Sequence, residues 1–474
     1  MHRRALRGAH APARRRDRHG HPGGRGRGHG AAAPGRRPRR GGDRADRGPG
    51  QPRRRALSGL GGTVSFLTHA ECTVCGHRHD VKRLLTVCER CGQMLAARYD
   101  LAGVRAAVDR ATLRARPRGM YRFRELTPLG AGEEPVTLGE GDTPLLPLPR
   151  LAAHLGLRRL WAKDESQNPT GTFKARGLGM AITRARTLGA RGVLIPSAGN
   201  AGGAAAVYAA RCGLPCAVVV PRDTPPAAVA EAVLAGARVF TVEGSIATAG
   251  QVVARAAPTL GWLDLSTLRE PYRLEGKKTM GLELAEQLDW AMPDVLVYPT
   301  GGGTGLLGIH KAAEELAALG WLATGPPRLV AVQPEGCAPV VRAWRDGAET
   351  TAPWPDPVTH APGLRVPSPF AGRQILRAIR ATHGLALTVS EREIQEAQRL
   401  LARVEGVWTA PEAAATVAAL PALVAQGALT AETRVVLVLT GAGVKTPPPP
   451  VPPPTDLAGP AEEAAARLLR ALAR

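Results

Sequence analysis

The chain has 474 residues, of which 44% are apolar and 22% charged, a composition that indicates a largely globular protein of roughly two to four domains. No apolar stretch approaches the roughly 20 residues that a membrane-spanning helix needs, and no apolar segment of a secretory signal follows the basic N-terminus. These features exclude a membrane-spanning protein and predict a cytoplasmic one.

The formal net charge of +23 is concentrated in residues 1–62, which contain 18 Arg and 3 Asp. This segment is rich in Gly and Pro and has too few apolar residues to offset the entropy of ordering, so we expect it to be disordered. The favoured explanation is a start codon assigned too early, because ordinary sequence begins near Val64. A targeting arm would contain more Ser and an amphipathic period, and a nucleic-acid-binding arm would contain aromatic residues, which are absent before Phe66. We therefore expect no nucleic-acid partner.

Residues 63–98 contain two Cys-x-x-Cys pairs, Cys72 with Cys75 and Cys88 with Cys91, separated by twelve residues. Each pair can hold one side of a tetrahedral ion through two thiolates, so the segment predicts a zinc-ribbon-like module with a structural zinc. Disulfides do not fit a chain without an export signal, and a redox pair would need a βαβ context that is absent here.

Beyond this module, short apolar runs alternate with Ala-rich helical stretches, which predicts an α/β fold with mainly parallel, doubly wound sheets. The strands are too many for one sheet, so we expect two α/β domains. A Pro-rich linker should follow at 446–455, and an amphipathic helix at 459–474. The strand candidates are 193–197, 216–221, 238–242, 295–298, 329–332 and 435–439.

The segment 165–177 contains an Asn168-Pro-Thr-Gly turn followed by Phe173-Lys174 at the start of a predicted helix. A lysine at a helix N-terminus lies against the positive end of the dipole, where the neutral amine is favoured. A neutral amine adds to aldehydes, so Lys174 suits imine formation with an aldehyde cofactor. A lysine in a first turn is more often a solvated charge, so this segment alone leaves both interpretations open.

Two glycine-rich loops, each between a predicted strand and a predicted helix, favour the first interpretation. In residues 196–203, free amides and a helix start suit a substrate carboxylate, and Asn200 could reach a phenolic oxygen of the cofactor. In residues 299–305, four glycines let the backbone wrap a phosphate, with the Thr304 hydroxyl as a further donor. Thr440 follows another buried strand and could bond a pyridine nitrogen. Each feature alone could be an ordinary turn or strand end.

In this order, the motifs resemble those of the fold-type-II pyridoxal-phosphate (PLP) enzymes, and among them the threonine synthases, over roughly residues 69–446. The resemblance is carried by the four-cysteine module, Leu138-Gly-Glu-Gly-Asp-Thr-Pro144-Leu, Asn168-Pro-Thr-Gly-Thr-Phe-Lys174, Ser197-Ala-Gly-Asn200, Pro271-Tyr-Arg273-Leu-Glu-Gly-Lys-Lys-Thr279, Gly301-Gly-Gly-Thr-Gly305 and Leu439-Thr440-Gly. It implies a homodimer that converts O-phospho-L-homoserine and water to L-threonine and phosphate.

The resemblance also implies the domain organisation. A larger PLP domain is expected in two parts, 99–186 and 294–446, with a smaller α/β domain inserted at 187–293. The Pro-rich linker and C-terminal helix then occupy 447–474.

The site residues implied by the resemblance are carried over position by position. Lys174 matches the Schiff-base lysine, Asn200 the residue beside the ring oxygen, and Thr440 the partner of the pyridine nitrogen. Arg273 matches a basic residue that helps hold the substrate phosphate. The cofactor-phosphate loop matches Gly301, Gly302, Gly303, Thr304 and Gly305, and the substrate-carboxylate loop matches Ser197, Ala198, Gly199 and Asn200.

Some positions depart from the threonine synthase pattern. Ala198, Ala201 and Leu268 lack hydroxyls that threonine synthases often carry, and Ala175 replaces a frequent Asp. The departures leave the cofactor site intact and keep a second interpretation open. In this second interpretation the chain catalyses another PLP reaction, as a threonine or serine dehydratase or a phosphoserine-using β-replacement enzyme of the cysteate synthase type does.

Lys277 and Lys278 have two interpretations, contact with a substrate phosphate or solvated charge. We favour the second for at least one of them.

Overall fold

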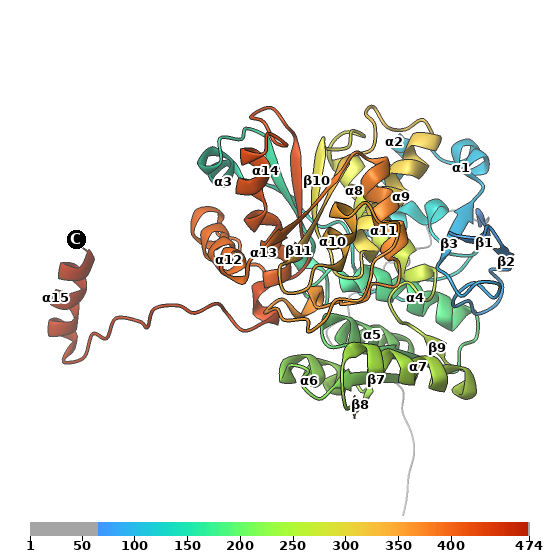
Figure 1. Cartoon of the computed structure of the whole chain (residues 1–474), viewed down its shortest axis with the longest axis horizontal. Helices are drawn as coiled ribbons and strands as arrows, with labels where there is room; N and C mark the ends of the chain where they lie inside the picture. The colour runs from blue at the N-terminus through green and yellow to red at the C-terminus, as the bar shows by residue number, and fades with distance from the viewer. Residues whose placement is uncertain (1–64, 473–474) are drawn as a thin grey trace, which may run out of the picture. The chain divides into compact units, whose positions relative to one another are not determined.

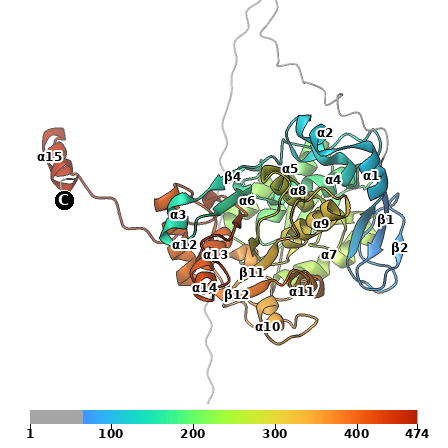
Figure 2. The same ribbon diagram turned by 90° about the horizontal axis from the view of Figure 1, so that it is seen from above.

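The computed structural model of the protein describes residues 65–472, so the arginine-rich segment predicted to be disordered lies outside the described residues. Three sheets organise the described part, with strand orders β2-β1-β3, β12-β11-β10-β13-β5-β4 and β8-β7-β6-β9 (Figures 1 and 2). The two larger sheets are mainly parallel, which confirms the predicted α/β class. Within residues 65–472, no helix combines the length and apolar character needed to cross a membrane.

The six-stranded sheet consists of buried apolar strands that run parallel, except for β4 at one edge, which is antiparallel to β5. Helices cover both of its faces, as buried strands of this kind require (Figure 1). One face packs against α8 (Tyr272–Gln287), α9 (Thr304–Ala318) and α11 (Gly372–Ala381), and the other against α3 (Pro149–His154), α12 (Glu391–Glu405), α13 (Pro411–Ala418) and α14 (Leu420–Ala425). The strands are β4 (Leu145–Pro147), β5 (Leu160–Asp164), β10 (Val295–Pro299), β11 (Arg328–Pro334), β12 (Leu385–Val389) and β13 (Val435–Leu439).

The four-stranded sheet is wholly parallel and lies within the predicted smaller domain. Apolar residues of α7 (Ile246–Leu260) pack on one face, and α5 (Asn200–Cys212) and α6 (Pro226–Leu234) accompany the other (Figure 1). The domain boundaries stay a prediction. The strands are β6 (Val193–Pro196), β7 (Cys216–Pro221), β8 (Arg238–Val242) and β9 (Leu263–Asp264).

The cysteine module is a small antiparallel sheet of β1 (Leu67–Cys72), β2 (Arg78–His79) and β3 (Leu95–Tyr99) with its own apolar cluster. Side-chain hydrogen bonds attach it to α11 and α8. Gln374 Nε2 donates to Thr73 Oγ1 at 2.7 Å, and Tyr99 Oη donates to Glu275 Oε2 at 2.7 Å. The module is therefore fixed to the helices on one face of the large sheet.

The remaining elements are short or peripheral. The predicted C-terminal helix forms as α15 (Ala461–Leu472), and none of its residues is buried. The others are α1 (Leu101–Ala107), α2 (Arg110–Ala115), α10 (Pro339–Arg345) and the 3₁₀ helices η1 (Met120–Leu126), η2 (Glu165–Gln167), η3 (Pro362–Leu364) and η4 (Gly443–Lys445).

The helix that begins with the candidate cofactor lysine, α4 (Lys174–Thr187), packs backbone to backbone against α8. A Cβ on Gly276 would collide with the carbonyl oxygen of Arg176, and one on Gly177 would lie 2.9 Å from the carbonyl oxygen of Arg273. Only glycine permits this approach at the two facing positions. The Arg176-Gly177 and Glu275-Gly276 pairs are therefore packing features as well as motif residues.

A buried ion network holds α4, α8 and β5 together. The Arg176 guanidinium donates to Glu165 at 2.6 and 2.8 Å, and to both carboxylate oxygens of Glu283 at 2.7 Å. Lys163 donates to Glu283 at 2.9 Å, so two cations face two anions. Burial alone would raise the pKa of Glu283, but Arg176 and Lys163 hold it well below its usual value. The network is neutral overall, and each charged group in it has a partner.

Glu283→Gln should lower the free energy of unfolding by about 3–5 kcal/mol, because it leaves Arg176 and Lys163 buried with too little negative charge. Urea denaturation followed by circular dichroism checks this. The control is Glu432→Gln, which breaks an exposed pair with Arg158 and should cost at most about 1 kcal/mol. Equal losses in the two variants would contradict the assigned role of the network.

Candidate active site

Three neighbouring parallel strands, β10, β13 and β5, end at the same edge of the large sheet. The segments that follow them are the glycine loop 301–305, Thr440, and the turn that leads to Lys174. Ligands of α/β proteins bind at the carboxyl edge of such sheets. The topology therefore brings together three predicted site segments that lie far apart in sequence.

The turn before Lys174 is fixed to the end of β13. Gly171 N–H donates to the carbonyl oxygen of Asn168 at 2.7 Å, and the positive φ of 66° at Gly171 explains the glycine there. Phe173 N–H donates to the carbonyl oxygen of Thr440 at 3.0 Å, and Thr172 forms a bridge with Gly441. Lys174 and Thr440 are thus held close together by backbone contacts.

Lys174 is the first residue of α4 and lines a cavity of about 1140 Å³. The pKa of its amine is lowered to about 8, mainly by burial and to a smaller extent by the nearby positive charge of Arg273. The Glu412 carboxylate acts in the opposite direction. A substantial fraction of the amine is therefore neutral near pH 8, in the form that can attack an aldehyde. These surroundings fit a lysine that holds an aldehyde cofactor.

The cavity lies between the two larger sheets. Its walls include residues 196–201 at the end of β6, residues 225–228 at the start of α6, and residues 362–367 from the large-sheet side. Two ion pairs connect the two sides: Arg365 with Asp223 at 3.1 Å, and Lys445 with Glu231 at 2.7 Å. The space is large enough for a cofactor together with a small substrate.

The first glycine-rich loop lines the cavity. Ser197 Oγ accepts a hydrogen bond from Gly202 N–H at 2.9 Å and donates one to the carbonyl oxygen of Gly199 at 2.9 Å. These bonds shape the loop that leads into α5, which begins at Asn200. Ser197, Ala198, Gly199 and Asn200 all lie on the cavity wall with Lys174.

The second loop, residues 301–305, does not line the cavity itself but lies against cavity-lining residues, Thr267, Gly363 and Val366. A Cβ on Gly302 would be 2.8 Å from Cγ2 of Thr267, which lines the cavity, and a Cβ on Gly305 would collide with Tyr298 Oη. The Tyr298 hydroxyl is buried and has no partner among the described residues. A hydroxyl donor without a partner, next to glycine backbone amides that no side chain covers, fits a loop that binds an anionic group. Thr440 likewise adjoins the cavity without lining it.

Arg273 and its neighbours lie inside α8. The Arg273 guanidinium donates to the carbonyl oxygen of Leu265, while its Nε is buried without a partner among the described residues. Burial lowers the pKa of Arg273, and the negative charges of Glu270 and Asp264 counteract this effect. Arg273 adds positive charge near Lys174 but does not itself line the cavity.

The expectation that Lys277 or Lys278 is a solvated charge is wrong for both residues, which are at most 1% exposed. Lys277 Nζ donates to the carbonyl oxygen of Phe173 and lies 4.0 Å from the centroid of the Phe173 ring. Lys278 pairs with Glu275 at 2.6 Å and Glu315 at 2.7 Å. Tertiary packing buries these charges on the α4 and α9 sides of α8.

Sequence reasoning missed Glu412, which lines the cavity at the start of α13 and acts electrostatically on Lys174. The local sequence, Thr409-Ala-Pro-Glu412, is that of an ordinary helix start, where an acidic residue is common. Only the pairing of α13 with the ends of the central strands brings this carboxyl to the cavity.

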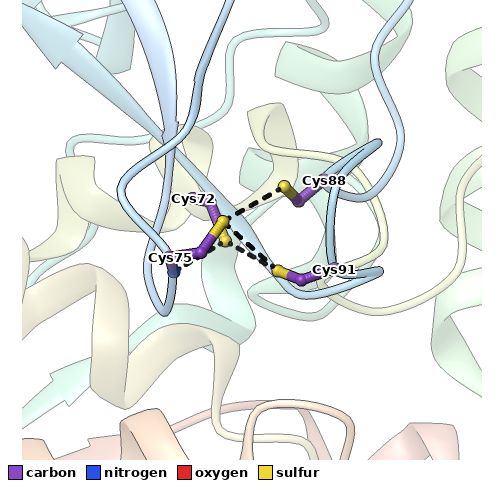
Figure 3. Close-up of side chains that lie close together, drawn as sticks. All are labelled: Cys72, Cys75, Cys88 and Cys91. Carbon is purple, nitrogen blue, oxygen red and sulfur yellow. Dashed lines mark hydrogen bonds between the residues drawn. The ribbon is translucent and has the colours of Figure 1, made fainter.

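The four cysteines of the module converge as predicted. Their sulfur atoms all lie within 4.8 Å of one another, with Sγ–Sγ distances of 3.4 Å from Cys72 to Cys91 and 3.7 Å from Cys75 to Cys88 (Figure 3). Zinc–sulfur bonds of about 2.3 Å place tetrahedral ligands about 3.8 Å apart. The arrangement therefore fits a four-thiolate metal site.

Comparison with known proteins agrees with this geometry. The family model described as "Pyridoxal-phosphate dependent enzyme" matches residues 136–441. The threonine synthase of Methanosarcina acetivorans is 35% identical over 80% of this chain and 92% of its own length. That of Methanocaldococcus jannaschii is 35% identical over 79% and 92%.

Solved structures show the same fold. The serine racemase of Dictyostelium discoideum is 25% identical, with a TM-score of 0.52 over 64% of this chain and 92% of that one. Maize serine racemase is 22% identical, with a TM-score of 0.56 over 70% and 92%. Family model, sequence relatives and fold agree, and the chain belongs to the pyridoxal-phosphate-dependent enzymes and, within them, to the threonine synthases.

Proposed function

We propose that this enzyme converts O-phospho-L-homoserine and water to L-threonine and phosphate, with Lys174 as its catalytic residue. The observation that carries the proposal is the amine of Lys174, which has a lowered pKa and lines one cavity with the Ser197–Asn200 loop. The threonine synthase relatives, similar over most of both chains, support this reaction over others of the family.

Each remaining site segment has a proposed role toward the cofactor. Lys174 would hold PLP through its amine, Asn200 would bond the ring oxygen, and Thr440 would bond the pyridine nitrogen. The amides of Gly301, Gly302, Gly303 and Gly305, with Thr304, hold the phosphate. Bound PLP withdraws electrons from the α-carbon of the substrate and so stabilises negative charge there. The unpaired Tyr298 hydroxyl beside the loop supports the phosphate assignment.

The substrate is held at both ends in this proposal. The amides of Ser197, Ala198, Gly199 and Asn200 bind its carboxylate at the start of α5. Arg273 attracts its phosphate, and the unpaired Nε of that side chain supports an anion on this side. Lys174 removes the α-proton and then the β-proton, and phosphate leaves from the γ-carbon. A proton is then returned to the γ-carbon, water adds its hydroxyl at the β-carbon, and a second proton is returned to the α-carbon.

A second function on the same scaffold is favoured by one observation. Ala198 and Ala201 line the cavity without the hydroxyls that threonine synthases often have there. A threonine or serine dehydratase, or a phosphoserine-using enzyme of the cysteate synthase type, would need fewer such donors.

We also propose that the enzyme is a cytoplasmic homodimer with one structural zinc on Cys72, Cys75, Cys88 and Cys91.

Phosphate release and amino-acid products should be measured with O-phospho-L-homoserine, L-threonine, L-serine and O-phospho-L-serine in parallel. We expect L-threonine and phosphate in equal amounts from phosphohomoserine alone. A keto acid or a sulfonate product from another substrate, without turnover of phosphohomoserine, would favour the second function.

Cofactor capture should report the lowered pKa of Lys174. The rate at which visible absorbance appears after PLP is added to cofactor-free protein should rise with pH, pass half its maximum near pH 8 and then level off. An unperturbed lysine would continue to gain reactivity up to about pH 10.4. Arg273→Gln should move the plateau to higher pH, because it removes a positive charge that disfavours the ammonium form. Lys174→Ala should abolish the absorbance, and its persistence would refute the assignment.

Metal analysis of the purified protein should find one zinc per chain, which Cys88→Ser should remove because three thiolates remain. The matched control is Cys337→Ser, which alters a buried cysteine outside the cluster and should leave the zinc content unchanged. Intact thiols without bound metal in the unaltered protein would contradict the zinc assignment.

A further inference from the structure

Glu412 is a buried residue of the cavity wall, and only one of its two carboxyl oxygens has a hydrogen-bond partner among the described residues. The side chain is 7% exposed. Its Oε1 accepts a hydrogen bond from Gly363 N–H at 2.7 Å, and its Oε2 is buried without a partner among the described residues. A carboxylate in this state costs free energy unless a ligand or a proton satisfies the second oxygen.

Among the acidic residues that line the cavity, Glu412 is the one whose charge acts on Lys174. Asp223 pairs instead with Arg365 at the edge of the cavity. Glu391 accepts a hydrogen bond from His360 N–H at 3.0 Å. Glu412 and Glu391 thus anchor the same 360–363 loop, and each has one buried oxygen without a partner among the described residues, but only the charge of Glu412 acts on Lys174.

The charged groups around Lys174 differ from those around Glu412. Lys174 faces the cations Arg273 and Lys277 of α8 and the single anion Glu412. On the Glu412 side, α12 contributes Glu391 to the cavity wall and the segment after η3 contributes Arg365. The central strands β10 and β13 carry no charged residue, and β11 carries only Arg328 at its start. Among the acidic residues of the cavity wall, Glu412 is therefore the candidate acceptor for a proton carried by Lys174.

Burial brings the pKa values of Glu412 and Lys174 closer together. It raises the pKa of Glu412, an effect that the Gly363 N–H and Lys174 partly offset, while the pKa of Lys174 falls to about 8. The difference between the two pKa values is therefore smaller than for an exposed Glu and Lys, and proton transfer between the two groups costs less free energy. Both groups lie on the wall of one cavity, and Glu412 Oε2 is buried without a partner among the described residues, so we infer that the pair can share one proton.

We propose that Glu412 is the proton partner of Lys174, a positioning residue that takes the proton from the lysine ammonium and later returns it. The transfer converts ammonium and carboxylate to neutral amine and carboxylic acid, and no electron leaves the pair. The inference rests on the proposed function, in which Lys174 removes two protons in succession. An amine that has taken the α-proton cannot take the β-proton until the first has moved on, and Glu412 Oε2 offers the place for it.

The test compares two reactions of the PLP-loaded enzyme that differ in the number of protons removed. Exchange of the α-proton of L-threonine in deuterated water, followed by proton NMR, needs one removal. Phosphate release from O-phospho-L-homoserine needs two. The variant is Glu412→Gln, which can keep the Gly363 hydrogen bond through its amide oxygen. Glu391→Gln is the matched control, since it alters the other anchor of the same loop.

Glu412→Gln should keep α-proton exchange within about threefold of the unaltered enzyme and lower phosphate release at least about 100-fold. Glu391→Gln should change neither rate more than about threefold. Glu412→Asp restores a carboxyl and should release phosphate at least about tenfold faster than Glu412→Gln.

A parallel loss of both reactions in Glu412→Gln, or phosphate release within threefold of normal, would overturn the inference. Equal loss in the Gln and Asp variants would overturn it as well, because a carboxyl would then have no special role. If the unaltered enzyme exchanges the α-proton but releases no phosphate, the proposed function fails and this inference fails with it.

Discussion

Arg176 occupies a position on which the geometry of the candidate active site depends. Its guanidinium is fully buried two residues after Lys174, and it bonds Glu165 from the β5 end and Glu283 from α8. Glu165 in turn accepts a hydrogen bond from Asn168 of the turn before Lys174, at 2.9 Å. Neither carboxylate can move without leaving a buried charge unpaired, so the start of α4 has one favourable position.

The charges on the two sides of α4 are balanced differently. In the network around Arg176, two cations and two anions compensate one another completely within the scaffold. Toward the cavity, Lys174, Lys277 and Arg273 form no ion pair among the described residues, and burial lowers the pKa of each. A scaffold that pairs its own charges and leaves excess positive charge at the cavity is suited to an anionic cofactor and an anionic substrate.

Local sequence patterns predicted much of the fold and the site. Buried parallel strands appear as apolar runs, and strand–loop–helix junctions with glycines mark the carboxyl edge of the sheet, so Lys174 and both loops could be found. The sequence could not show which charged residues are buried, because that depends on which helices meet. Lys277 and Lys278 were misjudged for this reason. Glu412 stayed hidden because its closeness to Lys174 arises only from the packing of α13 against the central strands.

The structure also separates the departures from the threonine synthase pattern into two kinds. Ala198 and Ala201 line the cavity, so the hydroxyls absent there would have faced a ligand. Leu268 is 1% exposed and packs in the core beneath α8 and α9, with a positive φ of 59°. A positive φ strains a residue with a branched side chain, and core packing compensates for it. The change at Leu268 is therefore a matter of packing, whereas the changes at Ala198 and Ala201 alter the wall of the cavity that Lys174 lines.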